Sequence, residues 1–157
     1  MRRKILDKML EWKKNGAGRT ALLIDGARRV GKSYSAVEFA KENYKSFILI
    51  DFNRVGKEVR DLFENNLNDL DSFFMYLSAI YGVTLYPRES LIVFDEAQMF
   101  PRARATIKYL VADGRYDYLE TSSLMFIHEN VQESKAGGSL LRLGIPKPIF
   151  YRLLEKK

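Results

Sequence analysis

The sequence contains no cysteine and a single histidine, His128, among its 157 residues. Without cysteine the chain cannot form a disulfide, a thiolate zinc site or a cysteine nucleophile. Imidazole chemistry could occur only at His128, and no motif surrounds that residue. Long apolar runs are missing as well, since none approaches the roughly 18 residues that a membrane helix requires. We therefore expect a cytoplasmic protein that does not enter a membrane.

Basic residues are concentrated at the N-terminus, although the whole chain carries a net charge of only +6. Residues 1–34 contain ten basic and three acidic residues, whereas residues 35–157 contain 16 and 17. The basic start leads into an amphipathic segment rather than the apolar core of a signal peptide. Such an N-terminus suits a nucleic-acid patch, a phosphate site or a solvated helix face. Composition alone does not choose among them.

Apolar segments alternate with helical ones along most of the chain. Four short apolar runs without polar alternation predict strands buried on both faces of a parallel sheet, at 20–25, 46–51, 91–94 and, more weakly, 116–120. Apolar spacing of three and four residues predicts helices at 3–14, 32–42, 55–66, 69–81 and 101–112. This order predicts βαβ units and a three-layer α/β fold with a mostly parallel sheet.

The length fits one domain, which we expect to span residues 1–157. It would consist of the basic helix 3–14, a core at 20–123 and a less regular C-terminal part at 124–157. Within that last part, 124–127 and 139–145 are strand candidates, and a final helix is expected to begin near Pro148.

A phosphate-binding motif follows the first expected strand, because Gly26–Ser33 fits G-x-x-x-x-G-K-[ST]. The two glycines let the backbone wrap closely around phosphates with its N–H groups pointing inward. Lys32 would reach the β- and γ-phosphates, and the Ser33 hydroxyl would bind Mg²⁺. The sequence thus predicts ATP binding by nine consecutive residues, which are Gly26, Ala27, Arg28, Arg29, Val30, Gly31, Lys32, Ser33 and Tyr34.

An acidic pair ends the third expected strand, where the apolar run 91–94 leads into Asp95 and Glu96. This is the Walker B arrangement, in which Asp95 would hold Mg²⁺ together with Ser33. Glu96 would polarise the attacking water as a general base. An acidic cap on a loop is the alternative interpretation of the same pair, and the phosphate loop upstream favours the catalytic one.

Hydroxyl and arginine side chains complete the candidate site. Thr121 and Ser122 begin the triplet 121–123 after the fourth expected strand, and they would sense the γ-phosphate; a loop or helix cap is the alternative. Arg102 and Arg104 could contact phosphates or a neighbouring subunit, although a solvated helix face explains each of them more simply.

The motifs together resemble a known family. The basic helix, residues 22–33, Phe94–Gln98, Pro101-Arg102 and Ile107–Leu110 occur in the order seen in bacterial and archaeal ATP-binding proteins with an AAA-like ATPase core. In that family an uncharacterised C-terminal domain follows the core, so the resemblance implies that this chain is the core alone. The sequence departs from the family pattern at Arg29, where Gln is usual, at Ser33, where Thr is commoner, and at Ser122-Ser123, where Gly-Ser is usual.

These observations predict a Mg²⁺-dependent ATPase whose five-stranded sheet places the strand of the hydroxyl triplet between the two Walker strands. The site contains no evident arginine finger, so we expect weak turnover by the isolated chain and a second subunit or partner that supplies one. Two other functions stay open. One is a small P-loop kinase, and the other is a nucleotide-gated module that binds nucleic acid through the basic helix.

Overall fold

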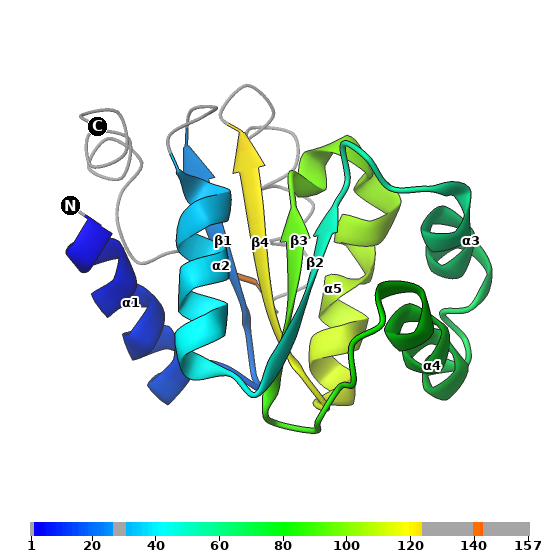
Figure 1. The fold of residues 1–157 in the computed structure, drawn as a ribbon, viewed down its shortest axis with the longest axis horizontal. Helices are drawn as coiled ribbons and strands as arrows, with labels where there is room; N and C mark the ends of the chain where they lie inside the picture. Colours follow the sequence, from blue (N-terminus) through cyan, green and yellow to red (C-terminus); the bar gives the residue numbers. More distant parts are fainter. Residues whose placement is uncertain (1, 27–30, 124–139, 143–157) are drawn as a thin grey trace.

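A computed structural model describes residues 2–26, 31–123 and 140–142. Five α-helices lie within these ranges, at Arg2–Asn15 (α1), Lys32–Asn43 (α2), Lys57–Asn65 (α3), Leu70–Tyr81 (α4) and Pro101–Asp113 (α5). A short 3₁₀ helix, η1, spans Ala97–Met99. The strands are Ala21–Gly26 (β1), Ser46–Asp51 (β2), Ser90–Asp95 (β3), Asp117–Ser123 (β4) and Leu140–Arg142 (β5), and Figure 1 shows their arrangement.

The strands form one parallel sheet in the order β2-β3-β4-β1-β5. The described strands thus confirm the expected five-stranded sheet, with β4 between the strands that precede the two motifs. Leu119 of β4 is the register partner of Leu22 on one side and of Val93 on the other. Because parallel strands share their direction, the carboxyl ends of β1, β3 and β4 meet at one edge of the sheet.

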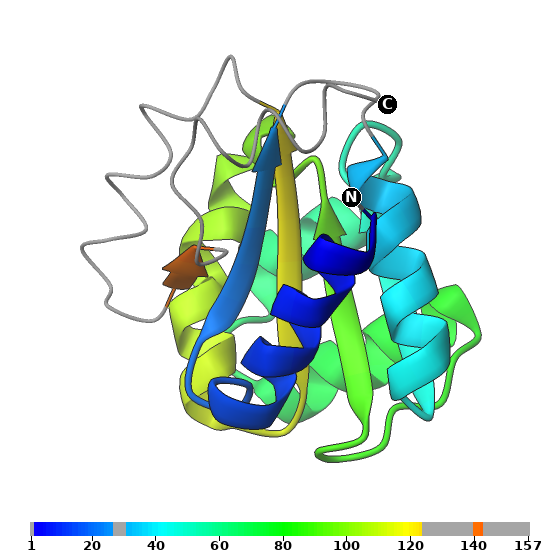
Figure 2. The ribbon, with the colours of Figure 1, turned by 90° about the vertical axis from the view of Figure 1, so that its left-hand side faces the viewer.

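Helices cover both faces of the sheet, as the alternating pattern predicts. Helices α1 and α2 lie on one face, and α5 lies on the other. Helices α3 and α4 lie next to α5, toward the edge of the sheet formed by β2 (Figures 1 and 2). The sheet therefore packs against two separate apolar cores. One core joins α1 and α2 to β1, β3 and β4, and the other joins α3, α4 and α5 to the opposite face.

The basic helix α1 is a structural part of the domain. Its apolar side chains Ile5, Met9 and Trp12 are fully or almost fully buried, as their spacing predicts. The indole N–H of Trp12 also donates a hydrogen bond of 3.2 Å to the hydroxyl of Thr20, just before β1. Among its basic residues, Lys13 lies with Nζ 4.9 Å from the ring centroid of Tyr44. No helix of the described residues is both long and apolar enough to span a bilayer.

The main departure from the sequence-based expectation concerns β4. The fourth strand was expected to end at residue 120, with the hydroxyl triplet in the loop behind it. Instead β4 continues to Ser123, and all seven of its residues are buried. The side chains of the triplet therefore alternate between the two faces of the sheet. His128, the strand candidate 124–127 and the final helix near Pro148 lie outside the described residues, as does most of the C-terminal part.

Candidate functional site

The phosphate loop joins the end of β1 to the start of α2. Its residues Ala27, Arg28, Arg29 and Val30 lie outside the described residues, whereas Gly26 ends β1 and Gly31 precedes α2. Gly31 has a φ of 91°, in the left-handed region that a residue with a side chain rarely adopts. Helix α2 thus directs its N-terminal N–H groups, which carry partial positive charge, toward the carboxyl edge of the sheet.

Lys32, the first residue of α2, is buried. Its side chain is 4% exposed, and Nζ donates a hydrogen bond of 3.3 Å to the carbonyl oxygen of Gly26. This contact brings the lysine ammonium group to the end of β1, where it is buried rather than in solvent. Tyr34, two residues further along α2, is half exposed.

Side chains from two other elements meet at Asp95, the last residue of β3. The Ser33 hydroxyl, on α2, donates a hydrogen bond of 2.6 Å to Asp95 Oδ1, and the Thr121 hydroxyl, on β4, donates one of 2.7 Å to the same oxygen. Burial raises the pKa of the Asp95 carboxyl; the two hydroxyl donors oppose the rise, and the nearby carboxylates of Asp51 and Glu96 add to it. The sequence predictions for Ser33, Asp95 and Thr121 therefore converge on one point.

Glu96 begins a sharp turn directly after β3. Its backbone has φ 55° and ψ 51°, the left-handed conformation that costs a residue with a side chain about 1–2 kcal/mol. Its N–H donates a hydrogen bond of 2.9 Å to Thr121 Oγ1. Strained backbone of this kind persists where the surroundings enforce it, and it is common at functional sites.

The carboxylate of Glu96 is held by two side chains that the sequence did not assign to it. The Ser123 hydroxyl lies 2.7 Å from Oε2 and 3.1 Å from Oε1, and the Gln98 amide nitrogen donates to Oε2 at 2.6 Å. Gln98 entered the sequence argument only through the family resemblance. Ser123 could have been found from strand alternation, which places it on the same face as Thr121.

Ser122 occupies the opposite face of β4 from Thr121 and Ser123. It is fully buried, and its hydroxyl has no hydrogen-bond partner among the described residues. The sequence grouped Ser122 with Thr121 as a phosphate sensor because it placed both in a loop. The strand geometry instead brings Ser123 to Glu96 and directs Ser122 away from it.

The face of β4 that carries Ser122 also contains a buried ion pair. Arg104 Nε lies 3.0 Å from Glu120 Oε1, and the two side chains are 2% and 1% exposed. This corrects the expectation of a solvated Arg104, because the residue lies on the face of α5 that packs against the sheet. Burial raises the pKa of Glu120 to about 7, and the positive charge of Arg104 opposes the rise.

Arg102 has a different environment from Arg104. It is exposed, and its guanidinium approaches the carbonyl oxygens of Phe63 and Glu64 at 3.5 and 3.4 Å. These carbonyls belong to the last turn of α3, where a cation is favourable. In the described structure Arg102 therefore links α5 to α3.

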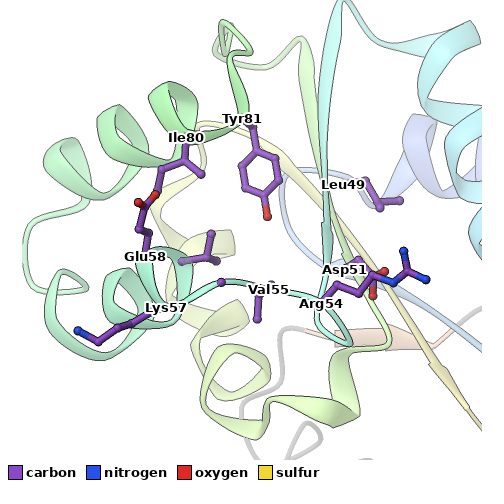
Figure 3. A pocket seen from close by; sticks show the side chains of 10 residues that line it. Leu49, Asp51, Arg54, Val55, Lys57, Glu58, Ile80 and Tyr81 are labelled. Atoms are coloured by element: carbon purple, nitrogen blue, oxygen red, sulfur yellow. The ribbon is translucent and has the colours of Figure 1, made fainter.

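A cavity of about 480 Å³ flanks the site beyond β2 (Figure 3). Its walls come from the end of β2, the segment 54–59 and the end of α4, and the ring of Tyr81 points into it. Among the described residues, none of those predicted to bind ATP lines it. Asp51, which does line it, is the register partner of Asp95.

The fold is that of a three-layer α/β domain of AAA-like type, with a strand inserted between those that carry the two motifs. Residues 18–143 match the AAA domain family, and the chain belongs to that family. Members of this family are P-loop ATPases, so membership implies ATP binding. No curated protein matches the sequence.

The solved structures that are similar to the chain include the two described next. The DnaC helicase loader shares 13% identity at a TM-score of 0.51, over 90% of this chain and 87% of the loader chain. PCH-2 of C. elegans shares 17% identity at a TM-score of 0.41, over 94% of this chain and 40% of the PCH-2 chain. At these identities the similarity to the loader supports the AAA-like fold.

Proposed function

We propose that the domain binds ATP with Mg²⁺ and hydrolyses it. The observation that carries this proposal is the convergence of Ser33, Thr121 and Asp95, in which two hydroxyls donate to one carboxylate oxygen. Loop residues 26–31 and the N-terminus of α2 would surround the phosphates, and Lys32 would neutralise their charge.

The residues around Asp95 fit a magnesium ion. Mg²⁺ prefers oxygen ligands, and a carboxylate and a hydroxyl oxygen 2.6 Å apart supply two of them next to the phosphate loop. Ser33 and Asp95 would hold the ion, and the bound ion would neutralise charge that develops on the phosphate oxygens. Burial disfavours an uncompensated charge on Asp95, and a nearby cation would remove that disadvantage.

Glu96 would act as the general base, and Ser123 would take the sensor position beside it. The Ser123 hydroxyl already lies 2.7 Å from the Glu96 carboxylate at the end of β4. A hydroxyl there can donate to a γ-phosphate oxygen or orient the attacking water. We assign this role to Ser123 in place of Ser122, and Thr121 supports Asp95 from the same face.

Full turnover would require a second subunit or partner. Of the two arginines considered for the site, Arg104 is buried against Glu120, and the Arg102 guanidinium contacts carbonyl oxygens at the end of α3. An arginine that stabilises charge on the transferring phosphate would then come from a neighbouring copy or another protein. AAA proteins commonly oligomerise, which agrees with this proposal.

The direct test is a mant-ATP titration with and without Mg²⁺, followed by phosphate release without any added acceptor. We expect binding that Mg²⁺ strengthens and slow phosphate release that rises with protein concentration. Lys32→Met should weaken mant-ATP binding at least about tenfold, since an ion–phosphate contact is among the stronger hydrogen bonds. If ATP binds but is turned over only when an acceptor is added, the result would favour the kinase alternative.

The strand geometry predicts a contrast between two neighbouring serines. Ser123→Ala should lower the rate of phosphate release about tenfold or more, because it removes the hydroxyl at Glu96. Ser122→Ala should leave that rate within about twofold, because its hydroxyl faces away from the site. The two variants are matched in size and strand, so equal rates would refute the assignment of Ser123.

A further inference from the structure

Gln98 is buried beside the proposed general base, and both ends of its amide are used there. The side chain is 5% exposed and belongs to η1. Its Nε2 donates to Glu96 Oε2 at 2.6 Å, and its Oε1 accepts from the N–H of Ser123 at 3.4 Å. A buried amide needs partners for both its donor and its acceptor, and here the same small cluster supplies both.

These contacts close a ring of three residues across the sheet. The Gln98 amide donates a hydrogen bond to Glu96, and the Ser123 hydroxyl donates one to the same carboxylate. The backbone N–H of Ser123 in turn donates to Gln98. The ring joins the turn after β3 to the last residue of β4. The Gln98 side chain thus makes hydrogen bonds to both Glu96 and the end of β4.

A glutamate needs such support to serve as a base. Its flexible side chain must be held within about 2.6–3.2 Å of the water whose proton it accepts. Ordering the side chain beforehand removes that entropic cost from the reaction step. The left-handed backbone of Glu96 directs the start of the side chain, and the ring fixes its end.

We propose that Gln98 is a positioning residue, which holds the Glu96 carboxylate in the orientation that hydrolysis requires. The inference rests on the proposed function, because it assigns a support to the general base. The amide is suited to this task, since it donates to Glu96 while accepting from Ser123. A glutamate at this position would lose the donor and place a second carboxylate against Glu96. Methionine would fill the space with neither donor nor acceptor.

The test compares Gln98→Met and Gln98→Glu with the wild type in phosphate release and mant-ATP binding. We expect kcat to fall about tenfold or more in both, while KM, the mant-ATP Kd and the melting temperature of Gln98→Met stay close to wild type. Met99→Ala, the exposed neighbour in η1, should leave kcat within about twofold. If Gln98→Met fails to fold, Gln98→Asn replaces it in the test. This variant retains a buried amide that is one methylene shorter, and we expect the same fall in kcat.

A double variant shows whether Gln98 acts through Glu96. In a Glu96→Gln background, Gln98→Met should cause no further loss, because residues that act as one unit are not additive. A wild-type kcat in Gln98→Met, or an equal tenfold loss in both backgrounds, overturns the proposal. If Glu96→Gln itself retains the wild-type rate, the general-base assignment falls instead, so the two failures are distinguishable.

Discussion

A Glu96→Gln variant should bind ATP as tightly as the wild type and release phosphate at least about 100-fold more slowly. General-base catalysis contributes typically about 10²–10⁴-fold, and an amide cannot accept the proton of the attacking water. The substitution preserves the size of the side chain and an oxygen that can accept from Ser123. It also leaves Lys32, Ser33 and Asp95 in place, so mant-ATP affinity should not change.

The matched control is Glu89→Gln, an exposed glutamate immediately before the other end of the same strand. It removes the same charge from the chain and should change neither binding nor hydrolysis. Single-turnover phosphate release under saturating Mg²⁺-ATP measures the step directly. Hydrolysis by Glu96→Gln at the parent rate would show that another group activates the water.

An Arg104→Met variant should lose about 3 kcal/mol or more of unfolding free energy at pH 8. Removing one partner of a buried ion pair leaves the other charge buried without compensation, which costs about 3–5 kcal/mol in proteins. Here the remaining group is Glu120, whose side chain is 1% exposed. A loss of this size is a large fraction of the roughly 5–15 kcal/mol that stabilises a typical domain.

The loss should be smaller at pH 5 because Glu120 can take up a proton. Burial already raises the pKa of Glu120 to about 7, from 4.5, and Arg104 opposes the rise, so the pKa would rise further without Arg104. A carboxyl with a raised folded-state pKa costs no stability below its ordinary value of 4.5; the cost grows as the pH rises from there to the folded-state value and is constant above it. Urea unfolding at both pH values, with exposed Arg102→Met as control, measures the difference. An equal loss at pH 5 and pH 8 would contradict it.

The sequence predicted the fold where burial and apolar composition coincide. Strands β1, β2 and β3 are mostly apolar, so their runs were visible, and the first turn of α5 was marked by Pro101. Strand β4 ended too early in the prediction, because its last three residues, Thr121 to Ser123, are polar and yet buried. Their burial depends on partners from other elements, which a local pattern does not contain.

The sequence motifs predicted some of the contacts at the candidate site. Ser33, Asp95 and Thr121 follow known motifs, and the structure brings them together. Two features escaped. That Ser123 rather than Ser122 lies beside Glu96 depends on which face of β4 each residue occupies. The burial of Arg104 depends on Glu120, which is 16 residues later on another element. Both follow from which side of the sheet a residue faces.

The central place of β4 has a consequence for how the protein is made. Leu119 pairs with Leu22, which lies 97 residues earlier (119 − 22), and with Val93, which lies 26 residues earlier (119 − 93). During synthesis, at about 5–20 residues per second, β1 and β3 are made before the strand that joins them. Such long-range pairing is slow, because the loop must close before its contacts form. ATP binding should therefore appear late in biogenesis, once β4 is in place, and a nascent chain that lacks β4 should not bind ATP.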